Sequence, residues 1–154
     1  MTAAGRPRGA GRERVLRTDG AARGNPGPAG AGAVLEDGEG RVLRETAEYL
    51  GSRTNNQAEY EALILGLQEA LDEAGARAAE TRLDVVLDSE LVVRQLVGRY
   101  RVKDAALRPL FEEARLLASR FGAFAPRHVP RGQNARADEL ANLAIDRAPS
   151  TAQG

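Results

Sequence analysis

Residues 18–30 read TDGAARGNPGPAG, and this stretch decides the fold because it joins two predicted β-strands. A β-forming run that includes Val15 and Thr18 precedes it, the run from Gly32 to Leu35 follows it, and five turn-forming residues fill positions 24–28. The pattern predicts an antiparallel hairpin whose irregular loop exposes its backbone.

Asp19 is the unusual residue of this hairpin because it falls in the strand rather than in the turn. Burying a carboxylate is costly unless a partner compensates its charge. A turn-capping role is the commonest one for Asp beside glycine, and it stands as the alternative. We favour a metal ligand, because three further acids occupy comparable positions later in the chain.

The first half of the chain then predicts an antiparallel meander followed by a helix. Three strands joined by short turns are expected at about 13–21, 30–36 and 41–50. Thr54 and Gln57 have the spacing of a capping box, and the helix that they open carries an apolar stripe of helical period as far as Ala74. Glu59 is expected in the first turn of this helix, at the edge of the buried stripe.

The second half alternates strands and helices. The apolar run 83–87 suits a central parallel strand covered on both faces, and Ser89 can cap a helix at 90–98. The remaining elements are a helix with Pro109 in its first turn, a strand at about 124–129 and a last helix with Asn134 as its cap and Asp138 in its first turn. The order β-β-β-α-β-α-α-β-α predicts one α/β domain with a mixed sheet and helices on both faces.

The composition limits the kind of site that this domain can carry. The chain has 154 residues, no cysteine and a single histidine, His128. A bound metal would therefore be held by oxygen ligands, which Mg²⁺ and Mn²⁺ prefer. No apolar stretch is long enough to span a membrane and no signal peptide is apparent, so we expect no membrane contact. The absence of cysteine is compatible with the cytoplasm, which we expect as the location, and we expect a monomer.

The net charge of zero is unevenly distributed along the chain. Residues 1–17 carry a net +4, which leaves −4 on the remainder. The Arg/Gly-rich residues 1–12 are expected to form a disordered basic arm, residues 13–147 the folded domain and residues 148–154 a disordered tail. The function of the arm stays open. Because 21 of the 22 basic residues of the whole chain are arginines, the arginines of the arm can reflect a preference for arginine over lysine throughout the sequence.

Four acids are expected to converge: Asp19, Glu59, Asp88 and Asp138. Sites in open α/β sheets form at the carboxyl ends of central parallel strands, where helix starts overhang them. Carboxylates so close repel and raise one another's pKa unless divalent cations lie between them. Two Mg²⁺ ions about 3.5–4 Å apart are the recurring arrangement for phosphodiester cleavage. Each acid alone has an ordinary explanation, as a cap or a first-turn acid, but four converging by accident is much harder to explain.

Several motifs, taken in order, closely resemble those of the ribonuclease HI family. They are Thr18-Asp19-Gly20 with the GNPGP loop of residues 24–28, TNNQAE at 54–59, Asp88-Ser89, and Asn134-x-x-x-Asp138-Glu139-Leu140-Ala141. The resemblance runs from about residue 14 to 146, and the combination is highly specific although each piece alone is weak. It implies a ribonuclease H-like fold with a five-stranded mixed sheet, in which two parallel strands extend the antiparallel meander.

The resemblance also implies an activity, which is endonucleolytic cleavage of RNA strands paired to DNA, leaving 3′-hydroxyl and 5′-phosphate ends. Two Mg²⁺ ions, with Mn²⁺ as a possible substitute, would be held by the four acids named above. Contacts to the hybrid are implied for Gly20, Asn25, Thr54, Asn55, Asn56, Gln57 and Ser89. Small loops and amides can approach a shallow minor groove and bond to 2′-hydroxyls. Capping is an equally good explanation for Thr54.

Two departures from the longer family members affect the expected mechanism. Their basic, aromatic-containing insertion after the fourth strand is reduced here to residues 99–103, so affinity would depend on fewer phosphate contacts or on the basic arm. Their mobile catalytic histidine has no counterpart in the loop before the last helix, where this chain has Arg131. Arg131 is expected to steer or release a phosphate, since it cannot shuttle a proton near neutral pH. His128 is expected to be structural.

Two rival functions remain at this stage. Another nuclease of the same fold, such as a polynucleotidyl transferase or resolvase, would share the acids but not the Asn-Asn-Gln and Gly-Asn-Pro-Gly motifs. A hybrid- or RNA-binding module that has lost catalysis would have no physical reason to keep four acids together. Whether double-stranded RNA is also a substrate is left open.

Overall fold

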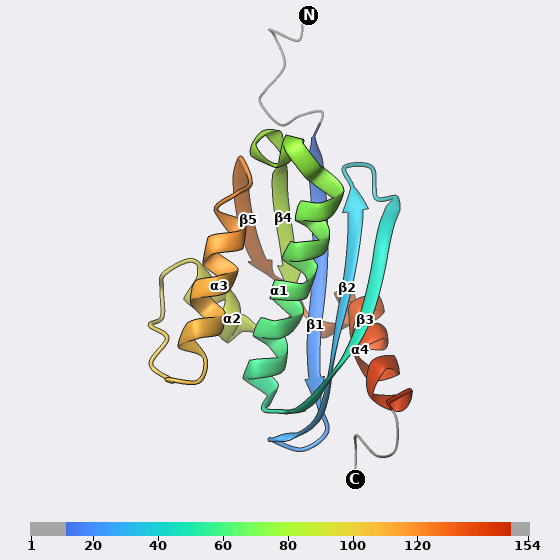
Figure 1. Cartoon of the computed structure of the whole chain (residues 1–154), viewed down its shortest axis with the longest axis vertical. Coiled ribbons are helices and arrows are strands. Elements are labelled where there is room, and N and C mark those ends of the chain that lie inside the picture. Colours follow the sequence, from blue (N-terminus) through green and yellow to red (C-terminus); the bar gives the residue numbers. More distant parts are fainter. Residues whose placement is uncertain (1–11, 149–154) are drawn as a thin grey trace, which may run out of the picture.

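The computed structural model describes residues 12–148 (Figure 1). Within this range one sheet has the strand order β3-β2-β1-β4-β5. β1 pairs antiparallel with β2 and parallel with β4, β2 pairs antiparallel with β3, and β4 pairs parallel with β5. The strands are β1 (Glu13–Ala22), β2 (Gly27–Asp37), β3 (Val42–Arg53), β4 (Arg82–Leu87) and β5 (Ala123–His128). The predicted fold class is confirmed. The predicted arm and tail, apart from their inner ends, lie outside the described residues.

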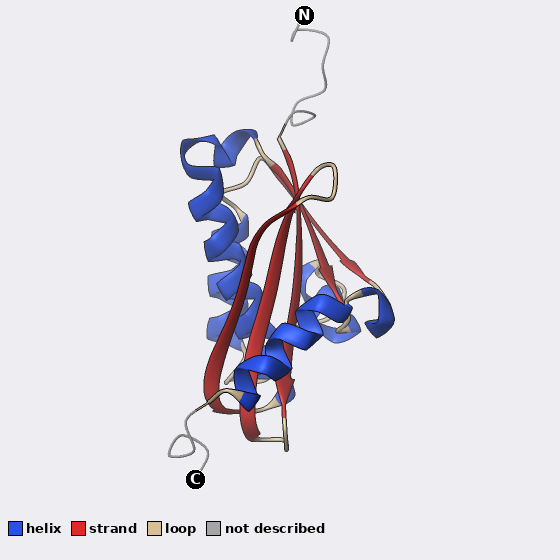
Figure 2. Cartoon of the chain, turned by 90° about the vertical axis from the view of Figure 1, so that its right-hand side faces the viewer, coloured by secondary structure: helices blue, strands red, loops and turns tan. Residues whose placement is uncertain are grey.

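Helices cover both faces of the sheet, as Figure 2 shows. The helices are α1 (Asn55–Ala74), α2 (Glu90–Leu96), α3 (Arg108–Ala118) and α4 (Ala135–Asp146), with the 3-10 turns η2 (Gly75–Glu80) and η3 (Arg131–Gln133). α1 packs on β1 and β2 and against α3, while α4 lies across β2, β1 and β3. None of the helices in the described part of the chain is long and apolar enough to cross a bilayer.

The β1–β2 hairpin is longer than the turn-forming residues suggest. β2 begins at Gly27 rather than at about residue 30, so Gly27 and Pro28 belong to the strand and only residues 23–26 form the loop. The backbone N–H of Arg23 donates to the Pro28 carbonyl oxygen at 2.8 Å. A proline at the start of a strand is tolerated, because the missing N–H is not required there. β3 is likewise longer than expected and ends at Arg53 rather than at about residue 50.

The main core lies between the sheet and α1. Its largest fully buried side chains include Tyr60, Leu16, Leu35, Leu63, Leu67, Leu83 and Leu87. Burying each of these contributes roughly 1.5–3 kcal/mol relative to exposure. The Tyr60 hydroxyl donates to Gln95 Oε1 at 2.6 Å, which satisfies both buried polar groups and joins α1 to α2.

The start of α1 follows the capping rule that the sequence predicts. Thr54 Oγ1 accepts from the backbone N–H of Gln57 at 3.2 Å, and Gln57 Oε1 accepts from the backbone N–H of Thr54 at 2.9 Å. The predicted cap of α4 is correct in position but not in its hydrogen bond. Asn134 is the N-cap residue, but its Oδ1 accepts no cap bond, and its Nδ2 donates to the carbonyl oxygen of Thr18 at 2.8 Å.

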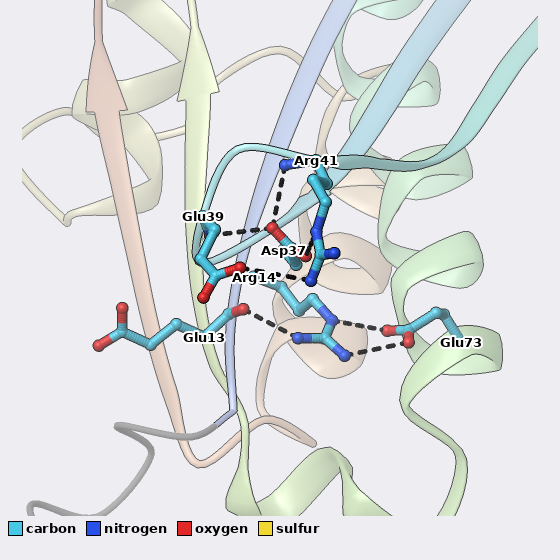
Figure 3. A network of polar contacts seen from close by, with 6 residues as sticks. All are labelled: Glu13, Arg14, Asp37, Glu39, Arg41 and Glu73. Carbon is cyan, nitrogen blue, oxygen red and sulfur yellow. Dashed lines mark hydrogen bonds and ion pairs between the residues drawn. The ribbon is translucent and has the colours of Figure 1, made fainter.

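A polar network closes the end of the sheet where β1 begins (Figure 3). Arg14 donates from Nε and Nη2 to the two carboxylate oxygens of Glu73 at 2.9 and 3.1 Å, which fastens β1 to α1. In the β2–β3 turn, Asp37 Oδ1 accepts from the backbone N–H groups of Glu39 and Arg41, both at 2.9 Å. The bond from Arg41 N–H is the main reason that the pKa of Asp37 lies below its usual value. This end of the sheet is opposite the end where β1 and β4 finish.

On the other face, α4 rests directly on the backbone of β2. A Cβ atom added to Gly30 would lie 2.2 Å from the Ala141 carbonyl oxygen, and one added to Gly32 would lie 2.3 Å from that of Ala137. Both distances are far below van der Waals contact, so only glycine permits this approach. The two glycines therefore set the distance between α4 and the sheet.

Gly32→Ala should destabilise the fold by about 3 kcal/mol, because the added methyl must push α4 away from β2. Thermal or denaturant unfolding measures the loss. Gly132→Ala is the matched control, since a Cβ there meets nothing within 4 Å. Equal stability of the two variants would contradict the close packing of α4.

Candidate active site

The candidate site lies where the parallel pairing of β1 with β4 ends, while β1 itself continues to Ala22. Their parallel pairing ends at Arg17 opposite Val86, so Asp19 and Asp88 follow just beyond the last pair. Asp88 follows the carboxyl end of β4 and Asp19 lies within β1 next to that end, as expected for a site in an α/β sheet. Asp19 is only 2% exposed, although it is ionisable.

Glu59 reaches this pair of acids from α1. It lies in the second turn of the helix rather than in the first, because α1 begins at Asn55. Glu59 Oε1 accepts from the backbone N–H of Gly20 at 3.1 Å. Gly20 allows this approach, since a Cβ there would lie 2.2 Å from the carbonyl carbon of Ala58. The glycine predicted to contact substrate thus has a clear packing role.

Three carboxylates form a cluster that could hold one cation. One oxygen from each of Asp19, Glu59 and Asp88 lies within 4.8 Å of the other two. Asp138 projects from the first turn of α4 and is half-buried, outside this group of three but within hydrogen-bonding reach of the Asp19 carboxyl. The structure therefore brings together all four acids that the sequence singles out.

The cluster is electrostatically unfavourable without a cation. Burial, followed by the charge of Glu59 and a hydrogen bond with Asp138, raises the pKa of Asp19 far above its usual range. Burial and then the charge of Asp88 raise the pKa of Glu59 to about 8. These are the effects of desolvation and of like charges on a carboxylate.

The donor set fits a hard divalent cation. Asp88 Oδ2 is buried and has no hydrogen-bond partner, and the nearest cationic atom is Arg131 Nε at 3.7 Å. An orphaned buried carboxylate oxygen of this kind needs a partner. All the available ligands are oxygens, which suits Mg²⁺ or Mn²⁺.

A cleft of about 540 Å³ opens onto the cluster. Besides the four acids, it is lined by Gly20, Ala21, Ala22, Asn55, Ser89, Arg131 and Asn142. The Arg131 side chain is 79% exposed, so it is free to reorient toward a bound molecule. His128 does not line this cleft. It lies exposed at the end of β5 and is therefore not part of the buried core.

The other predicted substrate contacts surround the start of α1. Asn55 and Asn56 are exposed, whereas Thr54 and Gln57 make the capping box. Asn25 Oδ1 accepts from the backbone N–H of Asn55 at 2.9 Å, so this side chain ties the β1–β2 loop to α1.

Ser89 is half-buried at the rim of the cleft, and its Oγ accepts from the backbone N–H of Val92 at 3.3 Å. The predicted cap of α2 is therefore confirmed.

One residue of the cleft, Asn142, and one residue that contacts it, Arg23, were not found from the sequence. Asn142 lines the cleft and donates from Nδ2 to the carbonyl oxygen of Asp138 at 3.0 Å. Arg23 pairs with Asp146 at 2.7 Å and also reaches Asn142, which ties the hairpin loop to α4. The spacing of four residues between Asp138 and Asn142 was the available signal, because it places both on one helix face.

The raised pKa values predict how the stability of the metal-free protein depends on pH. The folded state binds more protons than the unfolded state from the ordinary carboxyl pKa up to about 8 for Glu59 and about 10 for Asp19, so the free energy of unfolding should fall as pH rises through this window. Asp19→Asn should flatten the fall and stabilise the metal-free protein at pH 8 by about 2 kcal/mol. Denaturant unfolding in EDTA at pH 5.5, 7 and 8.5 measures this.

Asp84→Asn serves as the control, since Asp84 lies on β4 but pairs with Arg82 outside the cluster. A metal-free wild type that is more stable at pH 8.5 than at pH 5.5 would contradict the electrostatic account.

Sequence comparisons place this site within a known family. A family model described as reverse transcriptase-like matches residues 17–144. Ribonuclease HI of Halobacterium salinarum is 47% identical over 128 residues, which are 83% of this chain and 62% of that protein. The bifunctional protein Rv2228c of Mycobacterium tuberculosis is 45% identical over 139 residues, or 90% of this chain, but the match spans only 37% of that protein.

A solved structure agrees with these relatives. The crystal structure of LC11-RNase H1 in complex with an RNA/DNA hybrid superposes with a TM-score of 0.83 and 44% identity. The match covers 87% of this chain and 97% of that one. The acids, the sheet order and these comparisons agree, and the chain belongs to the ribonuclease HI family.

Proposed function

We propose that this chain is an endoribonuclease that hydrolyses the RNA strand of RNA–DNA hybrids and leaves 3′-hydroxyl and 5′-phosphate ends. The observation that carries the proposal is the buried cluster of Asp19, Glu59 and Asp88, with Asp138 beside it, at the base of an open cleft. A cluster of this kind destabilises the metal-free fold, which makes sense if it binds cations. The similar LC11-RNase H1 was crystallised with an RNA/DNA hybrid, which supports this choice of substrate.

Asp19, Glu59 and Asp88 are the residues that would hold one divalent ion, and Asp138 beside Asp19 would help to hold a second. Bound Mg²⁺, or Mn²⁺ in its place, supplies activation of the attacking water and charge stabilisation of the leaving oxygen. The protein fixes the carboxylates before substrate arrives, because Asp19 is held in a strand and Glu59 by the Gly20 N–H. Such preorganisation is a large part of electrostatic catalysis.

Recognition of the hybrid is proposed for the exposed start of α1. Asn55 and Asn56 are accessible amides beside the cleft, and Asn25 holds the backbone of Asn55 in place. Exposed amides on a helix start can bond to 2′-hydroxyls across a shallow minor groove, which identifies the RNA strand. Thr54 and Gln57 support this surface through the helix cap.

Phosphate contacts beyond the cleft are proposed for the short connector after α2. Arg101 and Lys103 line a separate cavity of about 470 Å³ together with Arg108 and Arg115 of α3. Cations along a groove provide affinity for a nucleic-acid backbone that weakens as salt concentration rises.

Cleavage assays test the proposed function directly. Labelled RNA–DNA hybrid should be cut in Mg²⁺ and left intact in EDTA, and DNA duplex should not be cut. An RNA duplex in the same assay shows whether double-stranded RNA is also a substrate. Asp88→Asn should lower the rate at least 1,000-fold, roughly the loss of several kcal/mol of charge stabilisation, with the fold retained.

Asp84→Asn makes the same chemical change on the same strand outside the cluster, so it should cut at the wild-type rate. Wild-type protein that binds hybrid equally with and without EDTA and never nicks it would support a binding module instead.

Arg131 and His128 can be separated by one comparison. Arg131→Ala should slow turnover roughly 10-fold, about 1.4 kcal/mol, because a mobile guanidinium acts on phosphate charge while the carboxylate cluster stays intact. His128→Ala should leave turnover unchanged, since His128 is exposed and does not line the cleft. Steady-state rates and melting temperatures of both variants measure this. A catalytically dead, normally stable His128→Ala would show that the histidine reaches the site as an acid–base group.

A further inference from the structure

Asn134 is a nearly fully buried amide that makes a long-range bond. Its side chain is part of a residue only 1% exposed, and its Nδ2 donates to the Thr18 carbonyl oxygen at 2.8 Å across 116 residues of sequence. Its Oδ1 is also buried and has no hydrogen-bond partner. Burying an amide whose oxygen has no hydrogen-bond partner costs free energy. The presence of Asn134 at this position therefore has to be explained by what its remaining bond, from Nδ2 to Thr18, does for the protein.

The bond acts on two of the acids. Thr18 is the first residue of β1 beyond the pairing with β4, and it immediately precedes Asp19. At the other end, the backbone carbonyl oxygen of Asn134 accepts from the N–H of Asp138 at 3.2 Å. One residue therefore joins the strand that carries Asp19 to the first turn of the helix that carries Asp138.

Other contacts of α4 do not replace this bond. Arg136 pairs with Glu45 of β3 at 2.8 Å, and Arg23 pairs with Asp146 at 2.7 Å, but both are surface pairs, which stabilise weakly. The contact of α4 with Gly30 and Gly32 fixes its distance from β2. Arg17 of β1 donates from Nη1 to the Gln133 carbonyl oxygen, but this bond is exposed and 3.4 Å long. The Asn134 amide makes the shorter, buried contact between the start of α4 and β1, directly beside Asp19.

We propose that Asn134 is a positioning residue that sets the separation of the Asp19 and Asp138 carboxylates, and thereby the affinity of the site for divalent cations. This inference rests on the proposed function, because it assumes that these carboxylates bind a metal ion. Asn134 itself touches neither substrate nor cation. It acts as the partner groups behind metal ligands do, by limiting how the ligands can move.

Asn134→Ala tests the proposal, with two readouts. The Mg²⁺ concentration for half-maximal cleavage should rise about tenfold, the lower end of what loss of a supporting partner costs. The rise in melting temperature produced by Mg²⁺ should shrink in parallel, without any substrate present. The KM for hybrid should stay near the wild-type value at saturating Mg²⁺, because the binding surface at α1 is unchanged.

Thr81→Val is the matched control. Thr81 is fully buried, and its hydroxyl donates to the Arg77 carbonyl oxygen at 2.8 Å, so the change also removes one buried side-chain-to-backbone bond. It lies just before β4, at the far end of that strand from Asp88. Thr81→Val should lower the melting temperature but leave both Mg²⁺ readouts at wild-type values. If Asn134→Ala fails to fold, Asn134→Ser keeps a polar group that ends one bond short of the Nδ2 position, and the same results are expected.

The outcomes separate the inference from the function on which it rests. Equal Mg²⁺ dependence in the Asn134 variant and the Thr81 control would overturn the positioning role while leaving the proposed function intact. A wild-type protein that neither cuts hybrid nor gains thermal stability from Mg²⁺ would overturn the proposed function, and the inference with it.

Discussion

The repulsion among buried carboxylates is the constraint on which the rest of the structure depends. Asp19, Glu59 and Asp88 offer oxygens within 4.8 Å of one another, in surroundings that raise the pKa of two of them. Left to themselves, these groups would take up protons or move apart. They stay together because each is carried by an element whose packing is decided elsewhere: a central strand, a long helix over the main core, and the end of a second buried strand.

The elements that follow from local chemistry were predictable. The capping box of Thr54 and Gln57 and the helical stripe after it locate α1, and the alternating runs locate the strands. The predicted element boundaries are wrong where a residue type that favours turns also occurs in a strand. Gly27 and Pro28 are turn-formers by composition, yet they begin β2, because the Arg23 N–H reaches across the loop to the Pro28 carbonyl oxygen. This bond joins two backbone groups of the folded hairpin, so the residue types of the loop do not predict it.

The candidate site shows the same limit. The four acids were predictable because Asp19 falls inside a strand and Glu59 at the edge of a buried helical stripe, and because the resemblance to a family groups these two with Asp88 and Asp138. For Asn134 only the N-cap position was predictable, since an Asn before a helix normally accepts a bond through Oδ1, whereas here Nδ2 donates to a carbonyl oxygen 116 residues away and Oδ1 has no partner. Asn142 and Arg23 were missed because their partners lie on other elements or on backbone atoms.

The contact between β2 and α4 has a consequence for how sequence variation in this protein would be interpreted. Gly30 and Gly32 carry no functional group, yet a single methyl at either position would shift the helix from which Asp138 projects. A screen that records only loss of the proposed hydrolysis would therefore rank these two glycines beside the four acids of the candidate site. In such a screen, glycines that are required because a side chain would not fit look the same as acids that are required for their carboxylates. A measurement of stability distinguishes the two classes.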